Sequence, residues 1–306
     1  MTRERGEGFD VRGAAHSSKN FLSRRAPAAL ALLLCLTTVA RGQGSWRLVW
    51  RDEFDGAKGS GVDRAKWGAE VGGSGWGNHE LEYYTDDKKN AHLDGRGHLV
   101  VEAFAETPPT ALKCWYGPCR YTSARLTTRK TFARAFGRFE ARMKLPFGQG
   151  VWPAFWLLGA NIGAVGWPAC GEIDVMENIG REPSLVHGTI HGPNHSGANG
   201  VGAQHALPGG KRFADDYHTF AVEWERWEIR WYVDGELYQT RRPTDLPAGA
   251  LWVYDHPFFI ILNLAVGGDW PHDPDATTSM PQTLTVDYVR AYERRSDTRR
   301  PRGARR

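Results

Sequence analysis

Strict alternation of apolar and polar residues recurs along the chain, and this pattern limits the fold more than any other feature of the sequence. Residues 137–145 place Phe139, Ala141, Met143 and Leu145 on one side and Arg138, Glu140, Arg142 and Lys144 on the other. Residues 227–233 repeat the pattern with Trp227, Ile229, Trp231 and Val233. Asp234-Gly235, a pair typical of hairpin turns, follows directly. Since side chains two residues apart share one face of a strand, we predict half-buried strands joined by tight turns.

The remaining segments favour the same fold class. Residues 258–264 are apolar throughout, which suits a strand buried on both faces. Leu284, Val286 and Tyr288 indicate a last strand, and turn-forming clusters stand at residues 72–75 and 208–210. No helical window of useful length follows residue 44. Many short strands with such turns predict an all-β protein, a two-sheet antiparallel sandwich or jelly roll, with one domain over residues 45–293.

The charge of the chain is unevenly distributed. The 306 residues carry a net charge of +4, but residues 1–42 contribute +4 and residues 293–306 contribute +5, which leaves −5 on residues 43–292. A nucleic-acid-binding protein would place its basic surface on the folded domain, so we expect no nucleic-acid partner. Residues 294–306 are rich in arginine, and we expect them to be a disordered tail.

The first 42 residues have the pattern of an N-terminal extension with a signal peptide. Arg24 and Arg25 precede an apolar run over residues 26–39, and small residues around Ala40 and Gly42 offer a cleavage zone. The run is shorter than the ~20 residues that span a membrane. We therefore predict a secreted protein with no stable membrane insertion after cleavage; a buried amphipathic helix is the alternative.

Export to an oxidising compartment determines how the cysteines are interpreted. Cys35 would leave with the signal peptide, so Cys114, Cys119 and Cys170 remain. Cys114 and Cys119 flank the turn-forming residues 115–118, and we predict a disulfide between them. Cys170 is left unpaired, as a small buried apolar residue.

Residues 171–178, GEIDVMEN, carry three acids within six positions. In a regular strand Glu172 and Asp174 point to the same face, whereas Glu177 has the wrong parity. A β-bulge that absorbs one residue near Met176 would return Glu177 to that face, and bulges are frequent beside active sites. We predict this bulge, with Ile173 and Val175 buried beneath the three carboxylates.

Three carboxylates on one face suit the cleavage of a glycosidic bond. Like charges at short range raise at least one pKa, so one carboxyl stays protonated while another is ionised. Glycoside hydrolysis needs both: an acid for the leaving oxygen and an anion for the anomeric carbon. Glu172 and Glu177 leaning toward each other would bring their carboxyl groups to about 5–5.5 Å, the spacing of retaining enzymes. A calcium cage and a solvated acidic edge strand are the alternatives.

At this segment the sequence resembles a known family. GEIDVMENIG is similar to the bulged Glu-x-Asp-x-x-Glu motif of glycoside hydrolase family 16, in its laminarinase-type β-1,3-glucanase branch. The resemblance runs from Trp50 to Tyr292, through the stretches 76–81, 137–142, 149–156, 187–193 and 263–268. One departure is His79, where the family more often has asparagine.

The resemblance implies a concanavalin A-like jelly roll whose concave face forms the substrate cleft. It implies Glu172 as nucleophile, Asp174 as the group that tunes it, and Glu177 as acid/base. Six further positions match residues that contact sugar in the family: Trp167, Asn78, Arg125, His191, Trp270 and Gln282. Core packing or loop stabilisation is the alternative role for these. The family needs no cofactor for catalysis but often carries a structural Ca²⁺, for which Glu53, Gly95 and Asp287 stand near the matching positions, partly through backbone oxygens.

The expected function is hydrolysis of internal β-1,3 linkages in β-glucans by double displacement, with a β-glucan polysaccharide as partner and the protein as a monomer. One alternative is a hydrolase of a sulfated galactan, which would be expected to have a basic cleft. Another is a non-catalytic β-glucan-recognition protein, which would lack one of the acids. His187, His191 and His195 are spaced like helical zinc ligands, but the intervening Gly and Pro residues make a helix improbable, so we predict a strand in the wall of the cleft.

Overall fold

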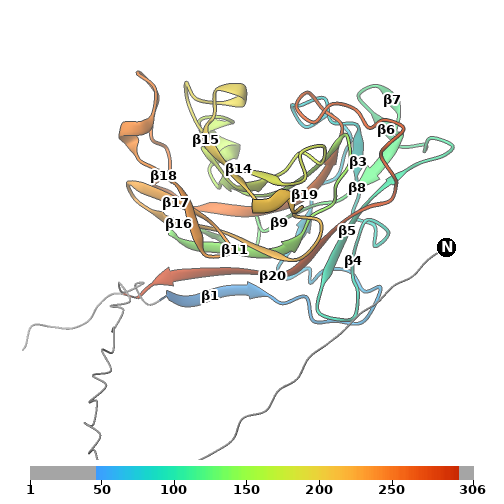
Figure 1. Ribbon diagram of the computed structural model, residues 1–306, viewed down its shortest axis with the longest axis horizontal. Helices are drawn as coiled ribbons and strands as arrows, with labels where there is room; N and C mark the ends of the chain where they lie inside the picture. The colour runs from blue at the N-terminus through green and yellow to red at the C-terminus, as the bar shows by residue number, and fades with distance from the viewer. Residues whose placement is uncertain (1–45, 296–306) are drawn as a thin grey trace, which may run out of the picture. The chain divides into compact units, whose positions relative to one another are not determined.

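The computed structural model describes residues 46–295, and these residues form a two-sheet antiparallel β-sandwich of the jelly-roll type (Figure 1). The first sheet of this region runs in the order β18 (Glu236–Arg241), β17 (Glu228–Val233), β16 (His218–Glu225), β11 (Gly137–Lys144), β20 (Gln282–Arg294), β5 (Leu99–Ala105), β8 (Tyr121–Ser123) and β3 (Glu82–Tyr84). Two more strands, β1 (Trp46–Asp52) and β4 (Ala91–Leu93), pair with β20 and β5. Of these neighbours, β3 and β8 run parallel to each other.

The second sheet carries the three acids. Its order is β15 (Val201–Ala206), β14 (Leu185–His191), β13 (Glu172–Glu177), β12 (Val151–Gly159), β19 (Phe258–Val266), β9 (Arg125–Thr127) and β2 (Gly68–Ala69), with β10 (Ala133–Arg134) on β19. A separate short hairpin joins β6 (Lys113–Cys114) and β7 (Gly117–Pro118). Figure 1 shows the second sheet curved, with the loops near β14–β15 and the β6–β7 hairpin rising at its two sides.

Helical structure is confined to short turns within the described residues. These are α1 (Ile162–Val165) and the 3₁₀ turns η1 (Gly197–Asn199), η2 (Pro208–Gly210) and η3 (Pro243–Asp245). Between residues 46 and 295, no helix has the length and apolar character that crossing a bilayer requires. The predicted signal peptide lies outside the described residues.

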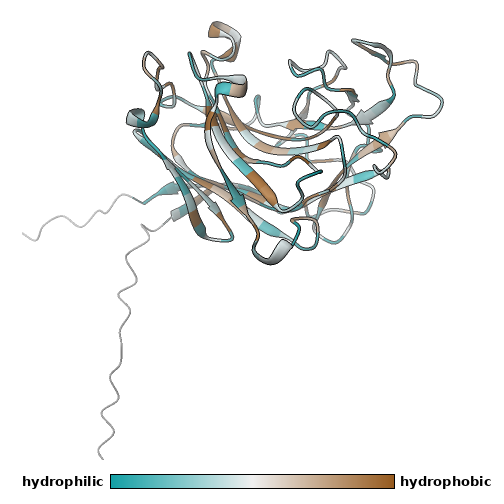
Figure 2. Ribbon diagram, turned by 45° about the horizontal axis from the view of Figure 1, so that its top comes forward, coloured by the Kyte–Doolittle hydropathy of each residue, from teal (hydrophilic) through white to brown (hydrophobic). Residues whose placement is uncertain are grey.

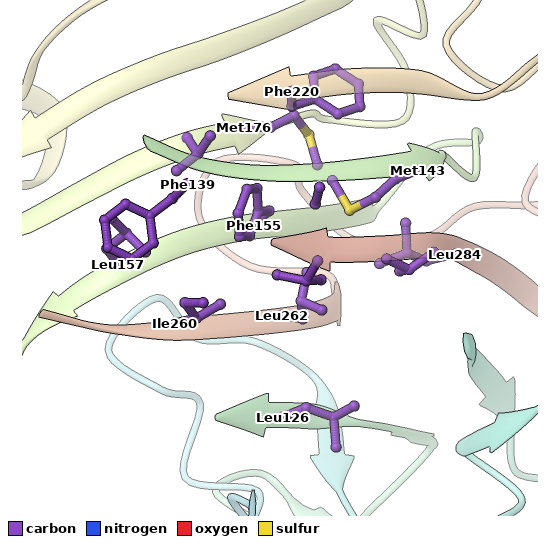
Figure 3. Packing of buried hydrophobic residues seen from close by; sticks show 14 of the residues in the cluster. Leu126, Phe139, Met143, Phe155, Leu157, Met176, Phe220, Ile260, Leu262 and Leu284 are labelled. Atoms are coloured by element: carbon purple, nitrogen blue, oxygen red, sulfur yellow. The ribbon is translucent and has the colours of Figure 1, made fainter. Parts of the chain in front are cut away.

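The core fills the space between the two sheets. Phe139 and Met143 on β11 of the first sheet, and Phe155 and Leu157 on β12 of the second, are fully buried, and Figure 3 shows them in one packed cluster with Met176 of β13. Apolar and polar residues alternate along many strands, as the colours of Figure 2 show. Burial of this apolar surface is the main driving force for the fold.

The strand predictions are confirmed in most details. All nine residues of β19 are buried, as expected for an apolar run that is covered on both faces. Asp234 and Gly235 form the β17–β18 turn with positive φ angles of 50° and 83°, the conformation of the predicted hairpin turn. Trp227 is an exception: it precedes β17 in the turn after β16 and is 57% exposed, because the strand begins only at Glu228.

The predicted disulfide is present. Cys114 and Cys119 are bonded and close the β6–β7 hairpin, while Cys170 is free and buried. At the C-terminal end, β20 continues to Arg294, which pairs with Trp46 of β1. The strand therefore includes the first residue of the predicted tail; residues 296–306 lie outside the described part of the chain.

Candidate active site

A β-bulge in β13 brings the three acids to one face. Against β12, Asp174 pairs with Trp156 and Met176 with Phe155, so Val175 has no partner. Against β14, the four residues from Asp174 to Glu177 lie opposite only three residues of the partner strand, from Thr189 to His187. Glu172, Asp174 and Glu177 consequently oppose alternate residues of both neighbours: Leu158, Trp156 and Ala154 on β12, and His191, Thr189 and His187 on β14. The predicted re-aiming of Glu177 is confirmed.

The residues of the bulge fill the core. Ile173, Val175 and Met176 are at most 2% exposed and belong to the main hydrophobic cluster. The consecutive side chains of Val175 and Met176 therefore both point inward, which an unbulged strand does not allow. Since their burial holds the extra residue in place, packing of the core determines where Glu177 points.

Trp231 supports the bulge from the opposite sheet. Its indole Nε1 donates a buried hydrogen bond of 2.8 Å to the backbone oxygen of Asp174, the last residue before the extra position. Gly188 of β14 makes room for this contact: a Cβ there would lie 2.5 Å from Trp231 Cδ1 and 2.4 Å from the hydroxyl oxygen of Tyr238. A buried carbonyl without a partner is costly, so this bond stabilises the bulged conformation.

Replacement of Trp231 by phenylalanine is expected to lower kcat about tenfold, because small misplacements of reacting groups are costly. The matched control is Trp224→Phe, which removes an equally buried indole N–H that donates to the Tyr254 carbonyl, outside β13. Both variants should lose similar stability in thermal unfolding. Equal kcat values for the two would show that Trp231 has no role in positioning the acids.

Glu172 is held by side chains from two elements. Trp167, in the loop before β13, donates from Nε1 to Glu172 Oε2 at 3.0 Å. His191 on β14 places Nε2 at 3.8 Å from Glu172 Oε1 and 3.2 Å from Asp174 Oδ2. Asp174 is only 3% exposed, so its carboxyl group lies below the other two. The structure thus places Trp167 and His191 beside the acids.

Glu177 has a different set of neighbours. Trp152 on β12 donates from Nε1 to Glu177 Oε1 at 3.1 Å. Trp270 packs edge-on against both Trp152, at 5.4 Å, and His187, at 4.8 Å between ring centroids. His187 is the residue of β14 that opposes Glu177. Trp152 was not among the residues predicted from the sequence, although it lies two positions before Ala154 on the same face of β12.

The electrostatic environment raises the pKa values of both outer acids. Burial raises the pKa of Glu172 to about 8, and the charge of Asp174 contributes to the rise. The charge of His191, the Trp167 N–H and Arg125 partly oppose it. Burial raises the pKa of Glu177 well above its usual value, and the charges of Asp174 and Glu172 raise it further. The pKa values of both acids are thus raised, and partly different neighbours oppose the rise: His191, Trp167 and Arg125 at Glu172, and His191 and Trp152 at Glu177.

Loss of the Trp167 hydrogen bond should move the acid limb of the pH profile upward. Trp167→Phe removes a donor that lowers the pKa of Glu172, so that pKa rises and the ionised form appears only at higher pH. A net hydrogen-bond energy of about 1 kcal/mol corresponds to a shift of roughly 0.7 units. The measurement is kcat/KM against pH, with Trp270→Phe as control, because Trp270 does not contact Glu172. An unchanged acid limb in Trp167→Phe would contradict the assignment.

Arg125 lies on the catalytic face of β9, which is separated from the strand of Glu177 by two strands, β12 and β19. The register runs from Glu177 through Ala154 and Asn263 to Arg125. Its guanidinium lies 4.7 Å from the ring centroids of Trp76 and Trp156, and its Nε donates to Glu70 at 2.5 Å. Arginine held between two indoles and a carboxylate has little conformational freedom. This rigid position agrees with a role in orienting a substrate.

The residues around Arg125 were mostly missed by the sequence analysis. Trp156 donates to Asn263 at 2.7 Å, Asn263 donates to the Tyr84 hydroxyl at 3.1 Å, and Tyr84 donates to Glu80 at 3.1 Å. Asn78, which was predicted, ends this chain by donating to Glu80 at 3.0 Å. The parity of residues within 151–159 places Trp152 and Trp156 on the same face of a strand. No local pattern, however, connects them with residues 76–84.

Gln282 does not join the other predicted sugar contacts. It begins β20 in the first sheet, is 7% exposed, and donates to the Ser279 carbonyl at 2.6 Å. The side chain therefore stabilises its own turn, which was the alternative role, and this corrects the expectation that it lies at the site.

The three histidines do not form a zinc site. His187 and His191 share one face of β14, as predicted, whereas His195 lies beyond the strand and bonds the Tyr254 hydroxyl at 2.7 Å. In residues 46–295, one group of three acidic or histidine side chains is close enough to hold a metal ion, namely Glu172, Asp174 and His191, whose ligand atoms lie within 4.8 Å of one another.

The side chains proposed for a structural Ca²⁺ have other partners. Glu53 accepts two hydrogen bonds from Arg290, at 2.9 and 2.7 Å, and Asp287 accepts one from Arg142 at 2.6 Å. Gly95 packs against the backbone of Lys58. Since both carboxylates are paired with arginine, a calcium ion there would be held through backbone oxygens, and calcium binding stays a prediction.

Comparisons with known proteins agree with this geometry. The family model "Glycosyl hydrolases family 16" matches residues 74–290. A beta-glucanase of Rhodothermus marinus is 44% identical over 261 residues, which is 81% of this chain and 85% of that protein. A glucan endo-1,3-beta-glucosidase of Cryptopygus antarcticus is 36% identical over 277 residues, which is 85% of this chain and 96% of that protein.

A solved structure shows the same fold. The catalytic domain of an endo-1,3-beta-glucanase (laminarinase) from Thermotoga petrophila superimposes with a TM-score of 0.77 at 48% sequence identity. The match covers 83% of this chain and all of that chain. The bulged carboxylate strand, the jelly-roll sandwich and the extent of these matches lead to one conclusion: the chain belongs to glycoside hydrolase family 16.

Proposed function

We propose that the protein is a secreted, retaining endo-β-1,3-glucanase that acts on laminarin-like β-glucans. The observation that carries the proposal is the position of Glu172 and Glu177 on one face of a bulged strand, with Asp174 between them. The relatives with similar sequences carry the names beta-glucanase and glucan endo-1,3-beta-glucosidase, which favour a β-1,3-glucan as substrate.

The two acids perform a double displacement. Glu172, as carboxylate, attacks the anomeric carbon and forms a glycosyl ester, while Glu177 donates its proton to the departing glycosidic oxygen. Glu177, now ionised, removes a proton from water, and the resulting hydroxide equivalent displaces Glu172 from the sugar. Glu172 is restored as carboxylate and Glu177 as acid, and two inversions retain the β configuration.

Neighbouring residues tune both steps. The Trp167 N–H and His191 favour the ionised nucleophile, whereas Asp174 and Glu172 keep the proton on Glu177. Burial also raises the pKa of Asp174 well above its usual value. A hydrolase of a sulfated galactan would be expected to have a basic cleft. Arg125, a cationic side chain on this face, is paired with Glu70 and so gives this alternative no support.

Product analysis tests the proposal. Laminarin, curdlan, lichenan and agarose are digested side by side, and fresh laminarin digests are followed by NMR. We expect laminarin to be cut internally, agarose to remain intact, and the β-anomer to appear first. Initial α-product would exclude double displacement, and preferential cleavage of agarose would exclude the glucanase assignment.

Secretion and a monomeric state are parts of the same proposal. The basic stretch and apolar run before residue 42 have the order of a signal peptide. The Cys114–Cys119 disulfide suits an oxidising compartment. Detection of the processed protein in culture medium, and its elution volume on a calibrated gel-filtration column, test the two points.

A further inference from the structure

A cavity of about 480 Å³ lies outside the group of residues that surrounds Glu172 and Glu177. Three segments line it, and the side chains that matter here are His79, Trp115, Arg120, Asp269, His272 and Asp273. Its volume is in the range of roughly 300–1,000 Å³ that is typical of ligand sites. No step of the proposed mechanism uses these residues.

Trp115 offers a fixed aromatic surface in this cavity. It lies in the turn of the disulfide-closed β6–β7 hairpin, is 50% exposed, and donates from Nε1 to the Glu80 carbonyl at 2.8 Å. Gly75, at φ +81°, permits close approach of the indole, because a Cβ there would lie 2.9 Å from Trp115 Cδ1. A half-exposed indole that is bonded and packed on its other side is preorganised for stacking.

The rim of the cavity carries both signs of charge. His79 Nδ1 lies 3.0 and 2.9 Å from the two carboxylate oxygens of Asp269, and the His79 ring packs edge-on against Trp115 at 5.2 Å. Arg120 lies over the Tyr116 ring at 5.0 Å. Donors and acceptors beside an aromatic face suit a neutral, hydroxyl-rich ligand such as a sugar ring.

Two loops connect the cavity with the catalytic face. One carries Asn78, the end of the hydrogen-bond chain from Trp156, directly before His79. The other carries Asp269 directly before Trp270, which packs on the Trp152 ring beside Glu177. The loops are joined by a hydrogen bond of 2.8 Å from the Asp269 N–H to the Asn78 carbonyl. In each loop, therefore, one residue is linked to the catalytic face and its neighbour lines the cavity. These pairs are Asn78 and His79 in the first loop, and Trp270 and Asp269 in the second.

We propose that this cavity is a second binding site for a glucosyl unit of the β-glucan, with Trp115 as the stacking surface and the His79–Asp269 pair as the hydrogen-bonding group. The inference rests on the proposed function, because the ligand is a part of the same polysaccharide. The glucosyl unit has two possible sources: the main chain at a distance from the cleaved bond, or a β-1,6-linked branch on that chain.

Chain-length dependence of KM tests the site. Trp115→Ala is compared with Trp227→Ala, a control that removes another exposed indole, on the turn between β16 and β17. The substrates are linear β-1,3-gluco-oligosaccharides of three to about eight units and branched laminarin. Trp115→Ala should raise KM about tenfold, equivalent to about 1.4 kcal/mol, with kcat unchanged. Trp227→Ala should leave both parameters unchanged.

The substrate series distinguishes the sources. An increase in KM for long linear chains, but not for the trisaccharide, indicates the main chain; an increase for branched laminarin alone indicates a branch. An equal effect at every length, or none with any substrate, would overturn the proposal. Asp269→Asn, which leaves the hairpin intact, should raise KM in the same substrates by a smaller factor and guards against misfolding of Trp115→Ala.

Direct binding separates this inference from the proposed activity. Calorimetric titration of the Glu172→Gln protein with long linear and branched oligosaccharides requires no catalysis, and adding Trp115→Ala should weaken binding about tenfold. If the wild type cleaved no glucan, the proposed function would fail, whereas this titration would still decide whether Trp115 binds the sugar. Equal affinity with and without Trp115 for both ligands would refute the second site.

Discussion

Glu172→Gln is expected to lower kcat on laminarin by about 10⁴-fold or more, because an amide cannot form the glycosyl ester. Glutamine has nearly the shape of glutamate and keeps an oxygen that accepts the Trp167 N–H at the 3.0 Å separation seen for Glu172. The loss should therefore be chemical and not structural. Initial rates on laminarin, with the protein purified from a host that lacks β-glucanase activity, measure it.

Binding provides the control for this variant. Affinity for a laminari-oligosaccharide should stay within about threefold of the wild-type value inferred from product inhibition, because Arg125 and Trp270, the predicted sugar contacts, are unchanged. The matched control is Glu182→Gln, a change in an acid outside β13 that hydrogen-bonds to Asn178 through its backbone carbonyl and not its side chain. Activity of Glu172→Gln above about one per cent of wild type would remove Glu172 from the role of nucleophile.

Glu177→Gln is expected to have an effect that depends on the leaving group. On laminarin, whose leaving alcohol needs a proton, kcat/KM should fall about 10³-fold, within the range for loss of a general acid. On a dinitrophenyl β-glucoside of suitable length, whose leaving group departs as a stable anion, kcat/KM should fall less than about tenfold. Parallel kinetics on both substrates make the comparison, and an equal loss on the two would assign Glu177 another role.

The stability of Glu177→Gln supplies an independent check with a defined sign. The pKa of Glu177 in the folded protein is raised well above the ordinary value of 4.5. Such an acid contributes stability that is fully present below its unfolded pKa and is lost as pH rises toward the folded pKa. Glutamine has no charge to bury, so the variant should have the higher Tm near pH 7, by roughly 2–4 °C for each kcal/mol, and no advantage near pH 4. A lower Tm near pH 7 would indicate that the carboxylate has a stabilising partner.

Local periodicity determined much of the fold in advance. The alternation in residues 137–145 identified β11 and its inward residues, and the apolar run at 258–264 identified a strand covered on both faces. The parity of Glu172, Asp174 and Glu177 required a bulge if all three act together, and the register confirms it beside Val175. These features depend on short-range geometry, which the order of residues expresses directly.

Contacts between residues far apart in the sequence could not be predicted from local periodicity. Trp231 reaches the Asp174 carbonyl from the opposite sheet, 57 residues away in sequence, through space left by Gly188. Arg125 lies between Trp76 and Trp156, and Gln282 turns out to bond its own turn in the other sheet. Nothing in the local sequence around any of these residues indicates its partner.

The order of residues alone thus determined the strands, the disulfide loop and the identity of the three acids, because periodicity and parity act over a few residues. The tertiary structure decided which aromatic and charged side chains hold those acids, in which direction their pKa values shift, and that His79, Trp115 and Asp269 line one cavity. The physical reason is that packing two curved sheets face to face joins segments far apart in sequence, and burial between them sets both the positions and the pKa values of the groups that react.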